Sequence, residues 1–353
     1  MKKLATFLVL LAMAGLIPLG SASGKDQAER VLDRYFEAAG GLDRLKGLES
    51  VSIDAQIPSF NNYEYTMHLL SDGRFRVEAP DRTTVYNGRQ YWQSFHGVVA
   101  ELTGDDIDQY RDLDLRQTLL HGFITADGKR AELKYAGQKN VRGQVCELLT
   151  GTAPDGDKRT YYVNANTGLV DKIEELTPDE EMRELKNIYT FKEYQAFDGI
   201  VLATLVQGQC LTNGEQIQPL TTLAEIRLNE SVDPGLFAKP ESAVPPVTMA
   251  GGALNGEVVG ISGGGSLITN ITMDDLQKLG PEDGDTVVSE VKGHTNQLLY
   301  MNNLESFGAI GRGDYLAIFN GTPSLWLVKA YLGMVSDDST YAIGDKVRLT
   351  VSK

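Results

Sequence analysis

Apolar and polar residues alternate along most of residues 51–228. In residues 63–69, for example, the odd positions are apolar or aromatic and the even positions are polar, and residues 75–79 repeat the pattern. A period of two is typical of antiparallel strands that bury one face. The sequence therefore predicts a large antiparallel sheet. Its buried face needs a cover, which could be a second sheet, helices or a ligand.

Helical spacing occurs at three places, two before this pattern and one within it. Asp26 and Glu29 fit a capping box, and Gly40-Gly41 is a stop signal for the helix that would follow them. Between these signals lies an apolar stripe with helical spacing, formed by Val31, Leu32, Tyr35 and Phe36. A short second helix would carry Leu42, Leu45 and Leu48. Residues 105–121 break the strand pattern, and we expect a helix there that lies over the sheet.

A boundary is expected near residue 240. Residues 238–256 hold three prolines and the pair Gly251-Gly252, with few large apolar residues. We expect a linker at 241–255 between domains at 24–240 and 256–353, and a length of 353 residues agrees with two domains. Beyond the linker, short strands punctuated by glycines indicate a small all-β barrel or sandwich. The predicted fold class is mainly β, with a few helices.

The first 23 residues have the features of a secretory signal peptide. Lys2 and Lys3 precede an apolar stretch at 4–19, and small residues at 21–23 suit cleavage before Gly24. An uncleaved anchor is the alternative. We expect a protein that is periplasmic or otherwise exported and that keeps no transmembrane anchor after cleavage. Removing the two lysines takes the formal charge from −15 to −17, which argues against nucleic acid or an anionic membrane surface as the main partner.

Cys146 and Cys210 are the two cysteines of the chain. An even count in an exported protein permits one disulfide. Both residues fall in expected strands, so two buried thiols are the alternative. The sequence does not show which distant strands are paired, so both interpretations stay open.

No constellation of residues recommends a reaction. The four histidines, at positions 68, 96, 121 and 294, share no metal-ligand spacing, and His121 would suit a helix end as a cation. The glycines at 263–265 lack the ending of a phosphate-binding loop and read better as a hairpin or bulge. We therefore expect no catalytic residues, no metal and no cofactor, and a protein that is not an enzyme.

Large apolar and aromatic residues are concentrated in the expected strands of the first domain. They form a core against the helices, or they line a groove for a lipid chain if the helices cover too little of the sheet. The residues proposed to line such an apolar-ligand cavity are Tyr65, Met67, Phe75, Trp92, Leu148, Tyr162 and Phe191.

Several motifs of the first domain follow one another in a recognisable order. In order they are Gly143–Leu148, Tyr161–Leu169, Tyr194–Ile200 and Asp233–Phe237. Together with the capped helix, the strand meander and the mid-chain helix, they resemble the outer-membrane lipoprotein-sorting (LolA-like) superfamily over about residues 25–240. The resemblance implies an unclosed antiparallel barrel lidded by helices, with an apolar cavity for the acyl chains of lipoproteins or lipids.

The second domain resembles an unrelated family. The segments Gly256–Ile261, Leu267–Ile271, Phe307–Ile318 and Ile343–Val347 are similar, in that order, to the C-terminal domain of S-adenosylmethionine hydroxide adenosyltransferases. In that family the barrel helps to hold the nucleoside, which makes Ser266, Asn270 and Trp326 candidate ligand residues. However, the family's Asp-Arg-Phe-Gly-Asn motif is replaced by Ser262–Ser266, and its catalytic N-terminal domain is absent.

These observations lead to three hypotheses. In the first, an exported binding protein holds a lipid, a lipoprotein acyl chain or another apolar ligand in the first domain, and the second domain docks an envelope partner or takes part in assembly. In the second, the C-terminal barrel binds S-adenosylmethionine or adenosine, as a binding protein or an enzyme. In the third, the protein is a structural envelope scaffold whose cavity is filled by side chains.

Overall fold

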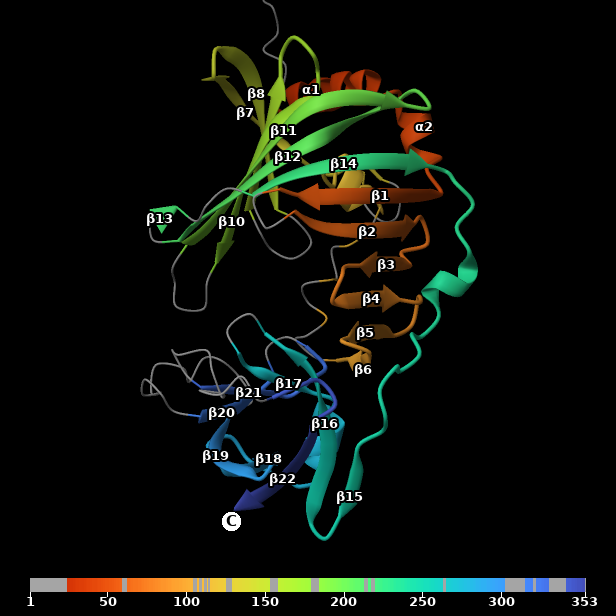
Figure 1. The fold of residues 1–353 in the computed structure, drawn as a ribbon. Helices are drawn as coiled ribbons and strands as arrows, with labels where there is room; N and C mark the ends of the chain where they lie inside the picture. Colours follow the sequence, from red (N-terminus) through yellow and green to blue (C-terminus); the bar gives the residue numbers. More distant parts are fainter. Residues whose placement is uncertain are drawn as a thin grey trace, which may run out of the picture.

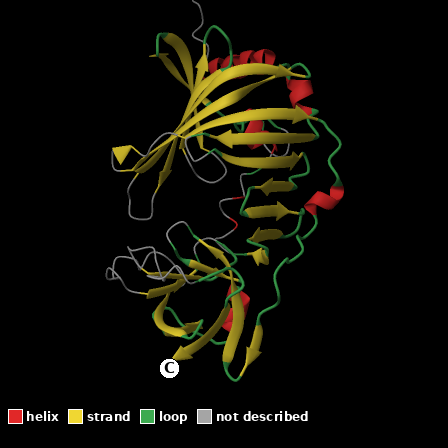
Figure 2. Ribbon diagram, viewed as in Figure 1, coloured by secondary structure: helices red, strands yellow, loops and turns green. Residues whose placement is uncertain are grey.

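Two sheets follow one another along the chain in the computed structural model (Figure 1). The structure describes residues 24–58, 62–103, 107, 110, 113, 115–124, 129–152, 158–178, 184–212, 215–216, 220–262, 265–301, 315–319, 322–329 and 341–352. The predicted signal peptide and most of the residues between 104 and 114 lie outside the described part. The described residues are predominantly strands, as predicted (Figure 2).

The first sheet is antiparallel throughout, and its pairing order is β6-β5-β4-β3-β2-β1-β14-β12-β11-β10-β9-β8-β7, with β13 attached to β12. No pairing among the described residues joins β6 to β7. The large antiparallel sheet predicted from the alternating pattern is therefore confirmed. Its strands are β1 (Ser50–Ile57), β2 (Tyr63–Leu70), β3 (Phe75–Glu78), β4 (Arg82–Tyr86), β5 (Tyr91–Phe95), β6 (Val98–Leu102), β7 (Lys134–Val141), β8 (Gln144–Thr152), β9 (Lys158–Asn164), β10 (Val170–Pro178), β11 (Glu184–Phe197), β12 (Ile200–Thr212), β13 (Glu215–Gln216) and β14 (Leu220–Leu228).

Helices α1 (Gly24–Ala38), α2 (Leu42–Lys46) and α3 (Leu115–Leu120) cover one face of this sheet, which we call the inner face. The predicted apolar stripe of α1 is buried against it, and so are Leu45 and Leu48. Each fully buried Leu or Phe stabilises the fold by about 1.5–3 kcal/mol relative to exposure. The first helix begins at Gly24, before the expected N-cap Asp26, which lies inside it.

The second sheet closes on itself. Its order is β15-β16-β17-β21-β20-β19-β18-β22, and an additional pairing of β16 with β22 completes a seven-stranded barrel. The pairs are antiparallel except β19 with β20, which is parallel. The small all-β barrel predicted for this part is therefore present. Its strands are β15 (Thr248–Ala250), β16 (Ala253–Ile261), β17 (Leu267–Thr269), β18 (Thr286–Val291), β19 (His294–Met301), β20 (Tyr315–Ile318), β21 (Trp326–Lys329) and β22 (Lys346–Ser352).

Two features of the second half differ from the sequence-based expectation. The proposed linker at 241–255 holds strand β15 and the beginning of β16, which form a hairpin turned at Gly251-Gly252. The helix α4 (Met273–Gln277) was not expected. Its N-cap Thr272 accepts a hydrogen bond from the Asp275 amide, and the Asp275 carboxylate accepts one from the Thr272 amide, which is a complete capping box.

The barrel packs against the end of the first sheet that finishes at β6 (Figure 1). Phe95 and Val98 of the sheet form one apolar cluster with Val259 and Ile268 of the barrel. The Trp326 ring stacks on Phe95 with 6.0 Å between ring centroids. An edge strand with free backbone groups invites pairing with other chains, and a covering element reduces that risk.

Candidate functional site

The inner face of the first sheet is the candidate site for an apolar ligand. Beneath the helices it is a filled core, in which Phe36, Leu69, Phe75 and Leu120 have almost no exposed surface. Farther along the same face the side chains are only partly buried, although they pack against that core. These partly buried residues include Tyr65, Met67, Val77, Tyr135, Tyr189 and Phe191.

Strand register places small residues in the middle of this partly buried region. Ala55 of β1 is paired with Tyr65 on one side and with Ala224 of β14 on the other. Two residues before Ala224 on β14, Thr222 is paired with Val206 of β12, and Val206 is paired with Phe191 of β11. The hydroxyl of Tyr65 is hydrogen-bonded to Thr222, so its ring reaches across the two alanines. Burial raises the pKa of this phenol, which keeps it neutral.

Four of the seven residues predicted to line a cavity share this face. Tyr65, Met67 and Phe191 belong to its partly buried region, and Phe75 lies fully buried in the adjacent core. That these four contact a ligand stays a prediction.

The other three predicted residues lie on the opposite, outer face, which corrects the proposed set. Tyr161 and Leu149 point into the core, so their neighbours Tyr162 and Leu148, which are paired with each other, point outward. Burial, followed by the adjacent Glu174, raises the pKa of Tyr162 to about 12, and the Lys172 ammonium lies 4.2 Å from the centre of its ring.

Trp92 lies on the outer face for the same reason. Tyr91 and Phe95 of the same strand point inward, and Trp92 carries the Lys239 ammonium 4.2 Å from its ring centre. All three misplacements have one cause: in a strand, adjacent residues point to opposite faces, and two aromatic or aliphatic neighbours in sequence give no sign of which one is buried.

A row of polar side chains crosses the inner face beside the apolar region. Arg159, Glu175, Asn187 and Cys210 stand opposite one another on four adjacent strands, β9 to β12. Arg159 and Glu175 form an ion pair of 2.6 Å with side chains 9% and 13% exposed, and the Asn187 amide donates to the same carboxylate at 3.5 Å. This row could not be predicted from the sequence, because its members are far apart in the chain.

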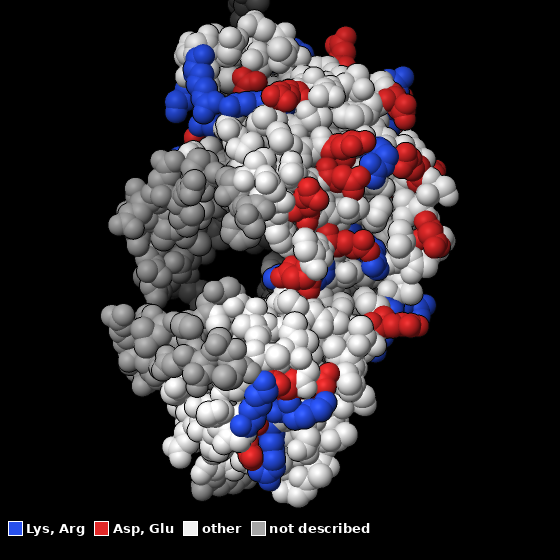
Figure 3. Space-filling model, viewed as in Figure 1, with Lys and Arg blue, Asp and Glu red and all other residues white. Residues whose placement is uncertain are grey.

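The outer face carries a different kind of hollow. A groove of about 810 Å³ runs over β1, β2, β3 and β14 and is bordered by residues of β11 and β12. Five carboxylates line it, Asp54, Glu64, Glu78, Glu193 and Glu225, and Ala55, Tyr65 and Ala224 of the apolar region also border it. Figure 3 shows that acidic side chains predominate on this side of the sheet, whereas a group of basic side chains lies on the barrel. A groove lined by carboxylates does not suit an acyl chain, because the chain would remove water from these polar groups.

The cysteines do not form a disulfide; Cys146 is buried, as the alternative of two buried thiols requires, whereas Cys210 is only partly buried. Three strands separate β8 from β12, which places the two residues about 19 Å apart across the sheet, far beyond the reach of a disulfide. They also lie on opposite faces. The Cys146 thiol donates to Asp171 at 3.6 Å, and burial together with this carboxylate raises its pKa to about 11.

The candidate residues of the barrel have roles within the protein. The Asn270 carboxamide accepts from the Glu257 amide at 2.8 Å and donates to the Pro245 carbonyl at 2.9 Å, so it fastens residues before β15 to the barrel. The Trp326 indole donates to Thr322 and its ring packs on Phe95, while the Ser266 amide donates to Ser262. A nucleoside ligand for these residues stays a prediction.

Within the described part of the chain, no group of three or more His, Cys, Asp or Glu side chains is arranged to hold a metal ion. His121 is not the helix-end cation that was expected. It packs against the Phe191 ring with 4.5 Å between centroids, and burial lowers its pKa to about 4, so the imidazole is neutral at pH 7.

Comparisons with known proteins return solved structures alone. No family model matches the chain, and no curated protein matches it. A DUF1329 family protein from Desulfovibrio piger is 14% identical, with a TM-score of 0.41 over 60% of this chain and 96% of that one. A LolA superfamily protein from Nitrosomonas europaea is 14% identical, with a TM-score of 0.37 over 58% and 96%.

A lipoprotein-sorting protein domain from Vibrio parahaemolyticus is 10% identical, with a TM-score of 0.38 over 60% of this chain and 95% of that one. Likenesses this weak carry no conclusion about function. In the described residues, no helix has the length and hydropathy required to cross a membrane.

Proposed function

We propose that the protein is an exported binding protein that holds the apolar part of a lipid, or of an acylated protein, on the inner face of its first sheet. The observation that carries this proposal is the partly buried apolar region around Tyr65, Met67 and Phe191, which continues the filled core but is not closed by it. Apolar side chains left in contact with water on a concave, helix-covered face favour a ligand of the same character.

The energetics favour binding without chemistry. Each methylene group that leaves water contributes about 0.8 kcal/mol, so a short stretch of acyl chain gives useful affinity with no catalytic residue. The adjacent polar row suits the polar end of an amphiphile. The Arg159–Glu175 pair offers both a donor and an acceptor beside the apolar region.

The C-terminal barrel has a separate role in this proposal. It covers the β6 end of the sheet, where its Trp326 packs against Phe95 and Val98 of the sheet. It also presents basic side chains, including Lys292, to solvent. We infer that it stabilises the open sheet and offers a surface for a partner in the cell envelope. The predicted signal peptide supports an exported location.

A fluorescent fatty acid tests the binding function. Cis-parinaric acid should bind the wild-type protein, and Met67→Glu should weaken its binding at least tenfold, because the substitution places a charge on the apolar surface that the acyl chain would cover. Titration of the probe's fluorescence measures the dissociation constant. Circular dichroism confirms that each variant is folded.

Leu148→Glu is the matched control, since it makes the same kind of change on the outer face of β8. Its affinity for the probe should equal that of the wild type. The proposal fails if the wild type does not bind the probe, or if the two variants lose the same amount of affinity.

A further inference from the structure

The pairing between β12 and β14 ends part of the way along both strands. Residues 205–208 of β12 are paired with residues 220–223 of β14, and Leu205–Leu223 is the last pair. Beyond it, the described pairings join β12 to β11 and β14 to β1. Figure 1 shows the two strands running apart toward the end at which α2 lies. The sheet is therefore open between Thr204 and Ala224, and we call this gap the opening.

The opening is short, because the end of α1 fills the gap farther along. The Val201 amide of β12 donates to the Ala39 carbonyl at 3.1 Å, so the chain that follows α1 occupies the free edge of β12. Residues 202–204 lie between this contact and the last pair of β12 with β14, a length of about 10 Å along the strand. A gap of this length admits an extended chain and excludes a folded domain.

The acidic groove of the outer face lies at this opening. It is lined from both sides of the gap, by Glu193 and Thr204 on β11 and β12 and by Ala224 on β14. Ala55 and Tyr65 also line it, although they belong, like Ala224, to the apolar region of the inner face. The groove of about 810 Å³ thus leads from the outer surface toward the region proposed to hold the ligand.

The backbone beside the opening is irregular. Glu193 of β11 has a φ of 52°, and it makes no pair with Thr204 in the described ladder, although the pairs before and after it are present. The Thr204 hydroxyl instead donates to the Glu193 carbonyl at 2.7 Å. A left-handed conformation is uncommon for residues other than glycine, and such residues gather at functional sites. This irregularity lies where β12 loses its partner β14.

One aromatic ring lies across the inner side of the opening. Tyr65 is paired with Ala55, and its hydroxyl is hydrogen-bonded to Thr222 of β14. The ring therefore crosses Ala55 and Ala224, whose small side chains leave room for it. A rotation of the Tyr65 side chain would uncover the two alanines and join the groove to the apolar region.

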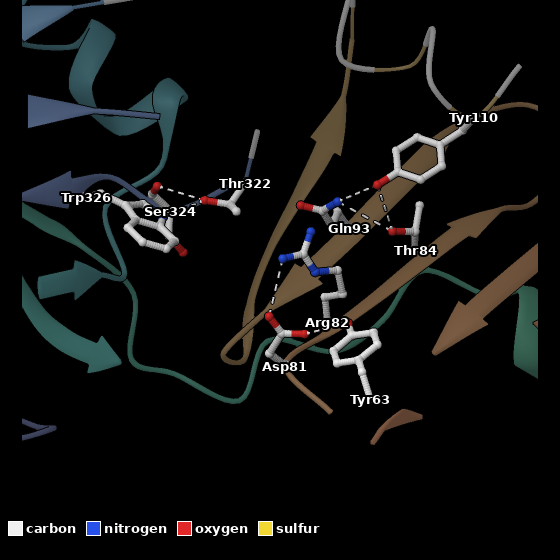
Figure 4. Close-up of polar contacts among 9 residues, drawn as sticks. All are labelled: Tyr63, Asp81, Arg82, Thr84, Gln93, Tyr110, Thr322, Ser324 and Trp326. Atoms are coloured by element: carbon white, nitrogen blue, oxygen red, sulfur yellow. Dashed lines mark hydrogen bonds and ion pairs between the residues drawn. The ribbon is translucent and has the colours of Figure 1, made fainter. Parts of the chain in front are cut away.

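The strand that carries Tyr65 is fixed in place. β2 is paired with β1 along its whole length and with β3 over its second half. Near its start, the Tyr63 hydroxyl donates to the Asp81 carboxylate at 3.3 Å, and the Arg82 guanidinium donates to the same carboxylate at 3.3 Å (Figure 4). We therefore expect the side chain of Tyr65 to move while the strand stays.

The carboxylates of the groove make it a passage and not a resting place for an acyl chain. Asp54 accepts a hydrogen bond from Arg227 at 2.7 Å, and this contact lowers the pKa of Asp54, so the outer wall stays charged. An acyl chain at rest beside such groups would displace their water, whereas on the inner face it meets apolar side chains.

We propose that the acyl chain of the ligand reaches the inner face through the opening between β12 and β14, and that the Tyr65 side chain is the gate of this route. The inference rests on the binding function proposed above and adds how the ligand enters. In the closed state the hydrogen bond to Thr222 holds the ring across the opening, and the ring swings aside to let the chain pass. A gate of this kind sets the rates of entry and exit and changes the affinity little.

The kinetics of binding test the gate. Stopped-flow fluorescence with cis-parinaric acid gives the association and dissociation rate constants, and titration gives the dissociation constant. Tyr65→Phe keeps the ring and removes the hydrogen bond, so both rate constants should rise at least about threefold while the dissociation constant stays within about twofold. Thr222→Val removes the same bond from the other side and should have the same effect. The double variant should be no faster than either single variant.

Tyr162→Phe is the matched control for the gate. It removes a hydroxyl that is hydrogen-bonded to Glu174 on the outer face, and it should leave both rate constants unchanged.

A block at the groove tests the route itself. Gln195→Cys places a thiol on the exposed wall of the groove, and coupling it to a polyethylene glycol maleimide should slow association about tenfold. The same label at Gln297→Cys, which is exposed on β19 of the barrel, should have no effect. Both variants also carry Cys210→Ser, since Cys210 is only partly buried.

Circular dichroism shows that each variant is folded. The route is overturned if the Tyr65 and Thr222 variants leave both rate constants unchanged, if they change the dissociation rate alone, or if the label at position 195 does not slow association. Each of these results leaves the proposed function in place as long as the wild type binds the probe at equilibrium. A wild type that does not bind the probe overturns both.

Discussion

A single histidine shows how the inner face sets the state of a side chain. His121 follows α3 with a φ of 56° and lies among the rings of Tyr35, Phe123 and Phe191. Removal from water disfavours the charged imidazolium, which lowers the pKa of this residue to about 4. The neutral ring thereby acts as part of the apolar surface.

Stability should therefore fall in acid, and His121→Asn should reduce the fall. The unfolded chain binds a proton at this residue below pH 6.5, whereas the folded protein binds it only near pH 4, so the stabilisation is complete above pH 6.5 and is lost between 6.5 and 4. The loss should amount to about 2 kcal/mol, less than the full shift implies because the ring keeps some contact with solvent.

Urea unfolding at a series of pH values measures this effect. Asparagine tolerates the left-handed backbone at this position and does not titrate. Parallel pH profiles for the wild type and His121→Asn would contradict the assignment of a depressed pKa to this residue.

At the residue scale, the sequence predicted some orientations and not others. Alternation over 63–69 correctly placed Tyr65 and Met67 with the core. It could not orient Trp92 or Tyr162, since each is adjacent in sequence to another aromatic residue. The alternating pattern does not show which of the two neighbours points into the core.

At the scale of elements, the end of α1 docks closely on the turn between β11 and β12. The Val201 amide donates to the Ala39 carbonyl at 3.1 Å, and the Arg44 guanidinium donates to the Gly199 carbonyl at 3.0 Å. Gly40 has a φ of +114°, and a Cβ at this position would overlap the Gly199 carbonyl oxygen. The helix that lids the inner face is held in place here.

Gly40→Ala should therefore destabilise the protein more than Gly41→Ala. Gly41 also has a positive φ, +98°, but no atom lies within 4 Å of a Cβ built on it. The Gly41 variant should lose about 1–3 kcal/mol through backbone strain alone, and the Gly40 variant about 2 kcal/mol more through the clash. If chemical unfolding showed the same loss of unfolding free energy in both variants, the close approach to Gly199 would contribute nothing to the difference between them.

Elements with a strong local signal could be predicted, and elements that depend on distant partners could not. The end of α1 at Gly40-Gly41, for example, follows from local turn chemistry. Strand β15 was assigned to a linker, because its three exposed residues have no apolar pattern of their own and are a strand only through pairing with β16.

At the scale of the whole molecule, neither the polar row nor the cover of the β6 edge could be predicted from the sequence. The polar row from Arg159 to Cys210 requires the order of four strands, and the cover requires the packing of the barrel on β6. Both depend on contacts between residues far apart in the chain. Composition and pattern nevertheless indicated an apolar inner face, and this is the feature on which the proposed function rests.

Native mass spectrometry of the mature protein, exported and purified without detergent, tests that function most directly. We expect a fraction of molecules to carry an additional mass, which organic extraction releases as an amphiphile with an acyl chain. This mass should be absent from Met67→Glu and retained in Leu148→Glu. A wild-type protein that shows the mass of the polypeptide alone, and that takes up no lipid when it is incubated with envelope lipids, would contradict the proposed function.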